Sequence, residues 1–226
     1  PEMSRGLGDV YKRQVWNGMF NSIFIATCSA VLCTYFSTMT AYAIHAYNFK
    51  AKKFMFTFIL AVMMIPTQVT ALGFLQLLGK IGLDDSFVPL IVPSIAAPVT
   101  FFYMKQYMES NLPLELVEAA RIDGSGEFNT FNKIVFPLMK PAIAVQAIFT
   151  FVQSWNNYFI PALVLHSDKK KTLPVLIAQL RSADFLKFDM GQVYVMIAFS
   201  IFPVIIVYIL LSRFIVEGVS AGAVKG

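Results

Sequence analysis

Apolar residues dominate this 226-residue chain in long runs that contain no Asp, Glu, Lys or Arg. An α-helix needs roughly 20 mostly apolar residues to cross a bilayer. Five segments meet that requirement, at about Phe20–Ala46, Phe54–Leu78, Phe87–Met104, Ala142–Leu165 and Met190–Leu211. Long polar linkers are absent between them. The pattern predicts an all-α, polytopic membrane helix bundle that forms one domain.

Composition agrees with a membrane location. The chain is 57% hydrophobic and 14% charged, against roughly 45–50% and about 25% in soluble domains. Its net charge of +5 is spread over short loops, without the basic stripe and interleaved aromatics of a nucleic-acid-binding protein. Cys28 and Cys33 lie in an apolar run, so no metal or redox site is expected there. No catalytic set of residues indicates an enzyme.

The first 14 residues differ in character from the rest. The chain begins with Pro1, and Asp9–Gln14 (DVYKRQ) resembles the translated end of a sequencing-library adapter. We therefore expect residues 1–14 to be an assembly artefact. Residues 15–226 would then form a membrane domain that is truncated at its N-terminus.

A spaced motif occupies the segment between the third and fourth runs, at about residues 110–141, here named the EAA segment. Glu118-Ala119-Ala120 is followed after three residues by Gly124, and after nine more by Ile134-Val135-Phe136-Pro137. This resembles the cytoplasmic EAA loop of binding-protein-dependent ABC importers, with Phe136 in place of a leucine. The resemblance implies contacts to a separate ATPase by Glu118, Ala119, Ala120, Arg121, Asp123, Gly124, Ile134 and Pro137.

The residues of the EAA segment predict two short helices. Ser110 or Asn111 can cap the first helix, Pro113 suits its first turn, and Gly124 provides its C-terminal stop. Small alanines on one surface would let a partner approach closely. Prolines are expected to end the second helix before the next span. An ordinary amphipathic surface loop is the remaining alternative.

A second resemblance covers essentially all of residues 15–226. The chain is similar to permeases of carbohydrate importers, in particular the second, smaller membrane subunit of maltose-type transporters. The resemblance is carried by Met64-Ile65-Pro66, Phe149-Thr150-Phe151, Ser154-Trp155-Asn156, Thr172-Leu173-Pro174 and the ending Phe214–Gly226. It implies that the C-terminal tail reaches the ATPase dimer interface.

The charges of the loops give only weak evidence for which side of the bundle faces the cytoplasm. Nine basic residues lie on the side of the EAA segment and six on the other, and cytoplasmic loops are enriched in Lys and Arg. The resemblance places the EAA segment inside. If the chain crosses the membrane five times and its C-terminus is inside, Val15 is outside, which implies that a first span is missing. The expected location is a bacterial or archaeal cell (inner) membrane.

Polar and aromatic residues cluster in the fourth run, at Gln146, Gln153, Ser154, Trp155, Asn156 and Asn157. Buried amides are costly unless they are paired. They would either join helices or line a sugar path, and the path would involve Gln153 to Asn157.

The outer loop from His166 to Asp189 is long and carries charges and aromatics. In maltose-type permeases the corresponding loop contacts the binding protein, which implies a role for Lys169, Lys170, Lys171 and Thr172. A solvated connector is the alternative.

Taken with the resemblance, these features predict a permease subunit of an ATP-driven sugar importer, with no cofactor of its own. ATP and Mg would be bound by a partner ATPase dimer. The other implied partners are a second permease subunit, an extracytoplasmic sugar-binding protein and membrane lipid. The alternatives are an ion-coupled secondary transporter, which the lack of acidic residues in the spans disfavours, and an ABC permease for a non-sugar solute.

Overall fold

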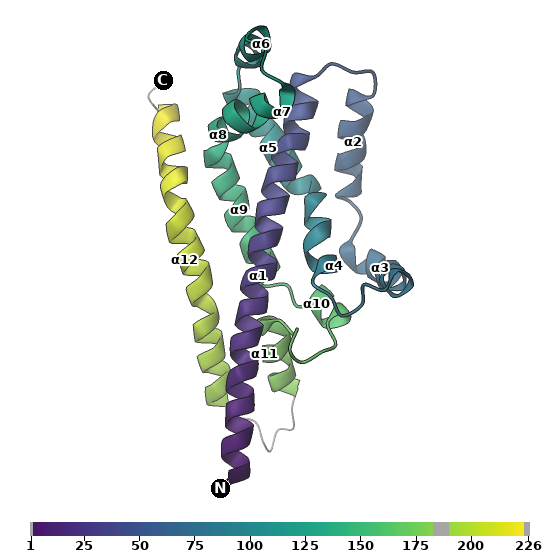
Figure 1. Ribbon diagram of the computed structural model, residues 1–226, viewed down its shortest axis with the longest axis vertical. Helices are drawn as coiled ribbons and strands as arrows, with labels where there is room; N and C mark the ends of the chain where they lie inside the picture. The colour runs from purple at the N-terminus through teal and green to yellow at the C-terminus, as the bar shows by residue number, and fades with distance from the viewer. Residues whose placement is uncertain (1, 183–189, 224–226) are drawn as a thin grey trace.

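The computed structural model describes the backbone of residues 2–182 and 190–223, and the side chains of residues 14–179, 191 and 194–214. In these ranges the chain forms helices joined by turns and loops, without a strand (Figure 1). The fold is therefore all-α, as predicted. The elements are α1 (Glu2–Ala46), α2 (Lys52–Val62), α3 (Thr67–Ile81), α4 (Val88–Ile91), η1 (Val92–Ile95), α5 (Pro98–Asn111), α6 (Leu114–Ile122), α7 (Glu127–Thr130), η2 (Phe131–Val135), α8 (Phe136–Leu138), α9 (Lys140–Trp155), α10 (Phe159–Val164), α11 (Leu173–Ser182) and α12 (Met190–Ala223).

Within the described ranges, three helical stretches are long and apolar enough to cross a membrane: Gln14–Ala46, Val88–Asn111 and Tyr194–Phe214. Two further pairs of helices reach that length only together. One pair is α2 with α3, bent by 96°, and the other is Glu127–Leu138 with α9, bent by 81°. The predicted number of five spans is met if each bent pair is counted as one.

The predicted span Phe54–Leu78 is interrupted at a proline. A proline inside a helix has no N–H and its ring clashes with the carbonyl four residues earlier. For Pro66 that residue is Val62, where α2 ends. The chain turns instead through the tighter bond from the Ile65 N–H to the Val62 oxygen (3.2 Å), and α3 starts at Thr67.

The predicted span Ala142–Leu165 is interrupted for the same reason. Pro161 would clash with the carbonyl of Asn157 in a continuous helix. The structure ends α9 at Trp155 and resumes as α10 at Phe159. Each of these two runs is therefore broken near a proline that is visible in the sequence, and proline is expected to bend a helix.

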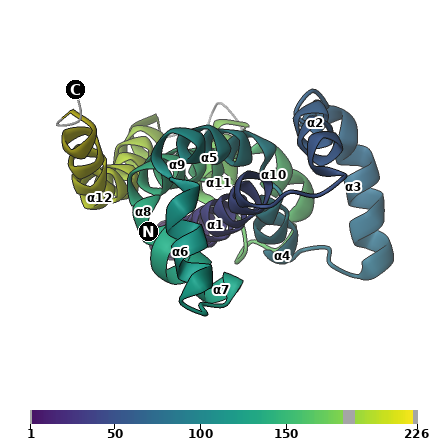
Figure 2. The same ribbon diagram turned by 90° about the horizontal axis from the view of Figure 1, so that it is seen from above.

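Helix α1 is the central element of the bundle. It packs against α5 and α9, while α12 lies along α9 on one side and α2 and α3 lie on the other (Figure 2). Small side chains let the helices approach closely, and the buried face of α1 carries Ala26, Ala30, Cys33, Ser37 and Ala41. Near its centre the Cys33 Sγ lies 3.4 Å from the Thr100 hydroxyl of α5 and 3.5 Å from the Thr150 hydroxyl of α9.

Two parts of the surface are apolar and uncovered. Helix α2 has no buried residue, and only 11% of the apolar window of α12 is buried. Exposed apolar surfaces of this extent require lipid or another protein to cover them. They are consistent with a helix bundle that sits in a membrane.

The two ends of the chain lie at opposite ends of the bundle. Figure 1 shows the start of α1 at the end of the bundle that holds α11, and the end of α12 at the end that holds α6. The Asn21 side chain donates hydrogen bonds to the backbone oxygens of Lys169 (2.9 Å) and Lys171 (3.0 Å). The start of the first span and the outer loop therefore lie at the same end of the bundle. This agrees with the expectation that five spans ending inside begin outside. Helix α1 continues through residues 2–14, whose expected foreign origin stays a prediction.

Candidate functional site

Helix α6 is the first half of the EAA segment and projects from one end of the bundle (Figure 1). Its N-cap is Pro113, with extended backbone and no side-chain capping bond. The expected cap by Ser110 or Asn111 was wrong, because α5 continues through Asn111. The Asn111 side chain instead donates to the Tyr107 oxygen of its own helix (2.9 Å).

Gly124 ends α6 as the motif predicts. It has a φ of +76°, a left-handed conformation that residues with a Cβ adopt at a cost. The Gly124 N–H donates to the Arg121 oxygen (3.0 Å) and the Ser125 N–H donates to the Ala120 oxygen (2.9 Å). This pair of bonds is a Schellman motif, which satisfies the last free carbonyls of the helix.

The second half of the EAA segment is less regular than expected. A turn of π-helix, η2, separates α7 from α8, and the Phe136 N–H donates to the Phe131 oxygen. Ile134 lies in this turn and Pro137 in α8, and both are half-buried. Helix α8 ends at Leu138, and the 81° bend to α9 follows. This bend turns the EAA segment out of line with the span.

The two sides of α6 differ in burial. Val117 (1% exposed) and Ala120 (5%) face the bundle, so Ala120 does not contribute to an outer surface. Glu118, Ala119 and Asp123 are exposed. Ile122 is 86% exposed, and Phe128 of α7 is 70% exposed. The outer surface of the EAA segment therefore combines acidic, small and large apolar side chains.

A polar cluster that sequence reasoning missed joins this segment to α1. The Arg121 guanidinium donates to both carboxylate oxygens of Glu127 (2.7 and 3.3 Å). The Tyr42 hydroxyl (3.1 Å) and the Tyr47 hydroxyl (2.5 Å) also donate to Glu127. The Arg121 guanidinium lies over the Tyr47 ring, 5.2 Å from its centroid. These four residues are named the tyrosine clamp.

Ionisation in the tyrosine clamp follows from these contacts. The bonds from Arg121, and then from Tyr47, lower the pKa of Glu127 to about 2. The same contact raises the pKa of Arg121 above its ordinary value. Burial, followed by the bond to Glu127, raises the pKa of Tyr47. The carboxylate and guanidinium therefore stay charged, and Tyr47 stays protonated, at neutral pH.

The sequence held one local signal for this cluster. Arg121 and Glu127 have opposite charges and flank the Gly124 turn, so that the turn brings them together. The two tyrosines are 80 and 85 residues away from Glu127 in the chain. Nothing in their local pattern distinguishes them from interfacial aromatics.

At the opposite end of the bundle, two of the four side chains expected to meet a binding protein pair with acidic residues of this chain, and a third is buried. The Lys170 Nζ lies 3.1 Å from an Asp85 carboxylate oxygen, and Lys171 pairs with Asp168 at 2.5 Å. Thr172 is 4% exposed. Lys169 is exposed, and the structure gives its side chain no ion pair among the described residues. Of the four expected contacts, Lys169 is the one whose side chain is free to meet a partner.

Of the polar and aromatic residues at the end of α9, some are packed between helices and others are exposed. Trp155 is 3% exposed and stacks on Phe151, with ring centroids 6.0 Å apart. Gln146 is also buried. Gln153 and Asn156 are exposed, whereas Ser154 and Asn157 are half-buried. Trp155 therefore belongs to the helix packing, and the exposed amides are the part that could face a solute.

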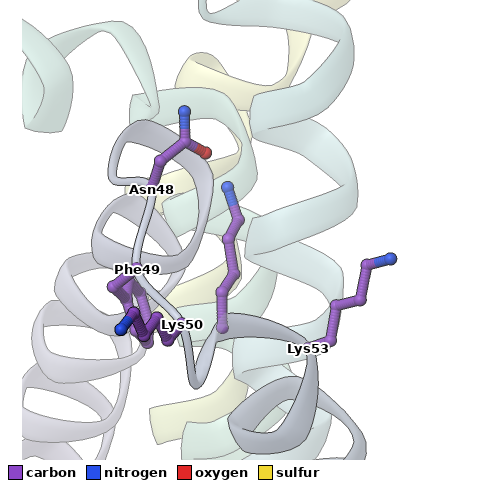
Figure 3. A pocket seen from close by; sticks show the side chains of 5 residues that line it. Asn48, Phe49, Lys50 and Lys53 are labelled. Carbon is purple, nitrogen blue, oxygen red and sulfur yellow. The ribbon is translucent and has the colours of Figure 1, made fainter.

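The loop between α1 and α2 carries three lysines. Figure 3 shows Asn48, Phe49, Lys50 and Lys53 around an open hollow of about 460 Å³, which Lys52 also lines. The Lys52 Nζ lies 3.4 Å from the His45 oxygen. This loop lies at the same end as α6 (Figure 1), so the lysines and the EAA segment share one side of the bundle.

Two further expectations concern metals and the C-terminal tail. Among the residues that the structure describes, no group of His, Cys, Asp or Glu could hold a metal ion. The expected tail Phe214–Gly226 is helical through Ala223 as part of α12. Its last three residues lie outside the described range.

Comparison with known proteins assigns the chain to a family. Residues 34–220 match the family described as the binding-protein-dependent transport system inner membrane component. The chain belongs to this family. It is therefore a multi-pass membrane transport protein and not an enzyme, and the ion-coupled alternative is set aside.

Individual relatives are transport permeases of bacteria. The arabinooligosaccharides permease of Halalkalibacterium halodurans is 37% identical over 93% of this chain and 75% of its own length. The melibiose/raffinose/stachyose import permease of Bacillus subtilis is 31% identical over 93% and 76%. The sn-glycerol-3-phosphate permease of Brucella abortus is 32% identical over 96% and 75%. None of these supports the archaeal alternative.

A solved structure supports the fold. The chain is similar to one in a bacterial ABC transporter involved in the import of the acidic polysaccharide alginate. The TM-score is 0.76 at 24% identity, over 88% of this chain and 75% of the other. At this identity the likeness concerns the fold alone.

Proposed function

We propose that this chain is the permease subunit of an ATP-driven sugar importer and that its EAA segment docks onto a separate ATPase. The exposed outer surface of α6 and α7 carries the proposal. Ile122 and Phe128 are among the most exposed large apolar residues described, and Ile122 lies one helical turn after Glu118 of the motif. Exposed apolar side chains next to charges are typical of a protein interface.

In the proposed mechanism the partner ATPase hydrolyses ATP and this chain changes conformation. The ATPase dimer would bind ATP and Mg, and its closure would move the docked EAA segment. The bundle would then alternate between inward-facing and outward-facing states around the solute. A second permease subunit and lipid would cover the apolar surfaces of α2 and α12. The family description, which names a binding-protein-dependent system, supports this assembly.

The outer loop is the proposed contact for an extracytoplasmic sugar-binding protein. Asn21 and Asp85 hold the backbone of residues 166–171 through the bonds from the Asn21 amide and to the Asp85 carboxylate. This fixed loop presents Lys169 to solvent. Exposed charges of this kind steer association more than they add affinity.

The proposed solute is an oligosaccharide that passes the exposed amides Gln153 and Asn156. Relatives named for arabinooligosaccharides and for melibiose, raffinose and stachyose support a sugar, whereas a relative named for sn-glycerol-3-phosphate supports the non-sugar alternative. Uptake of labelled arabinotriose, raffinose and sn-glycerol-3-phosphate by cells that produce the whole transporter would separate these classes. Uptake of the phosphate ester alone would reject the sugar assignment.

Docking is tested with Glu118→Lys and Gly124→Val. The first reverses a charge at the proposed interface, where like-charge contact costs roughly several kcal/mol. The second places a β-branched residue at a φ of +76°, which costs about 1–2 kcal/mol. Both variants should insert in the membrane but lose co-purifying ATPase and uptake together.

Gly126→Val is the matched control for the glycine. Gly126 has a φ of −68° and an added Cβ meets no atom within 4 Å, so valine fits there. Normal ATPase co-purification by Glu118→Lys and Gly124→Val would show that the EAA segment is only a connector.

A further inference from the structure

Three polar contacts hold the EAA segment against α1. The Tyr35 hydroxyl donates to the Asn132 side chain (3.1 Å) and the His45 ring lies 3.2 Å from the Leu112 oxygen. Between them, the Tyr42 hydroxyl of the tyrosine clamp donates to Glu127. The contacts therefore reach the start, the middle and the end of the segment.

Apolar packing supports the same contact. Ala41 and Ile44 of α1 are buried in one cluster with Val117 of α6 and with Phe131 and Val135 of η2, a cluster to which α5 also contributes Met104 and Met108. The Tyr42 ring lies 5.8 Å from the Phe131 ring. The inner end of α1 and the EAA segment thus share one core as well as a polar cluster.

The covalent connections of the EAA segment to α5 and to α9 are not continuous helix. Leu112, which joins α5 to α6, has an extended backbone (φ −116°, ψ 95°), so the helix does not continue across it. At the other end the chain bends by 81° before α9. A bend or a helix break absorbs movement more readily than a packed contact does.

We infer that the tyrosine clamp makes the EAA segment and the C-terminal end of α1 (about residues 35–46) one rigid unit. Helix α1 then carries the movement of the segment into the membrane. Glu127 is the positioning residue of this unit. It binds Arg121 across the Gly124 turn and both tyrosines from the α1 side. The inference rests on the proposed function, because it takes the ATPase as the source of the movement.

Spin labels can test the rigid unit in the assembled transporter. One label is attached at Ala43→Cys on α1 and the other at Glu115→Cys on α6, with both native cysteines replaced by serine. The distance distribution is measured without nucleotide and after trapping with ATP and vanadate. The wild-type clamp should give one narrow distance in both states. Glu127→Gln should broaden and shift it in the trapped state.

Two further variants distinguish loss of the clamp bonds from misfolding and from the loss of any one carboxylate. Tyr42→Phe combined with Tyr47→Phe removes only the two hydroxyl donors and should broaden the distance in the same direction. Glu109→Gln removes a carboxylate that pairs with Lys105 within α5, and should leave the distance unchanged. The measurement needs no sugar and so does not depend on the substrate class.

The outcomes distinguish this inference from the proposed function. A Glu127→Gln transporter that retains its ATPase but loses the narrow distance supports the clamp, with coupled ATP hydrolysis reduced roughly twofold to thirtyfold, as expected for coupling residues. An unchanged distance in Glu127→Gln, or a wild-type distance that changes on trapping, overturns the inference while docking stands. Loss of the ATPase in Glu127→Gln would make Glu127 a docking residue and also overturn it.

Discussion

At the scale of single residues, Asp85 organises the outer loop. It has a φ of +53°, which is rare for a residue with a side chain. Its carboxylate accepts bonds from the His166 N–H (2.9 Å), the Ser167 N–H (3.0 Å), the Ser167 hydroxyl and the Lys170 Nζ. The bonds from Ser167, and then that from His166, hold the pKa of Asp85 well below its ordinary value. One carboxylate thereby fixes the loop that presents Lys169.

Asp85→Asn should loosen this loop without changing its backbone preference, because asparagine tolerates a left-handed conformation. Proteolysis of the loop should become faster at neutral pH. The contribution of the ionised Asp85 is present above the ordinary carboxyl pKa of 3.8 and is lost as the pH falls toward the lower folded value. The difference between the wild type and Asp85→Asn should therefore shrink in acid.

Lys169→Ser is the matched control for this prediction. Lys169 is exposed and has no ion pair among the described side chains, so its loss should leave proteolysis unchanged while weakening engagement of the binding protein. Equal proteolysis of Asp85→Asn and wild type at neutral pH would show that the carboxylate does not hold the loop.

At the scale of elements, local chemistry explains what the sequence could predict. The spacing of the EAA motif predicted a helix that stops at Gly124, because the stop depends on one backbone conformation. The two proline breaks were readable as kinks, but their angles depend on which helices pack nearby. The bond between Tyr42 and Glu127 was beyond sequence reasoning, because it joins residues 85 positions apart.

Close approach between α1 and α11 gives a prediction at this scale. A Cβ on Gly18 would lie 2.5 Å from the Leu176 Cδ1 and 3.4 Å from the Leu173 nitrogen. The end of the Leu176 side chain must shift, so Gly18→Ala should destabilise the protein by about 1–2 kcal/mol, the overpacking cost reduced by the better helix propensity of alanine. Leu176→Ala removes the clashing atom, so the double variant should lose less stability than the two single variants added together.

Gly73→Ala provides the comparison for thermal unfolding in detergent. Gly73 lies inside α3, and an added Cβ meets nothing within 4 Å. Alanine should stabilise this helix by up to about 1 kcal/mol. If Gly18→Ala and Gly73→Ala change the free energy of unfolding in the same direction, the α1–α11 contact is looser than the structure indicates.

At the scale of the whole molecule, α1 reaches both of the proposed partner contacts. Near its start, Asn21 and Ser22 bond to Lys169, Lys171 and the Leu173 N–H. Near its end it joins the tyrosine clamp. Gln14–Ala46 is 33 residues, about 50 Å of helix at 1.5 Å per residue. One straight helix therefore links the outer loop to the EAA segment, so the two proposed partner contacts must lie on opposite sides of the membrane.

Cysteine labelling in intact cells tests this arrangement. In a background without the native cysteines, Lys169→Cys should react with a reagent that cannot cross the membrane, whereas Ala119→Cys should react only after the cells are opened. Both positions are exposed in the isolated chain, and cells that lack the partner ATPase are used so that docking does not cover Ala119. Reaction at Ala119 from outside would invert the bundle and separate the EAA segment from any cytoplasmic ATPase. Reaction at Lys169 alone would place the three lysines of the α1–α2 loop inside, on the side where basic loops are enriched.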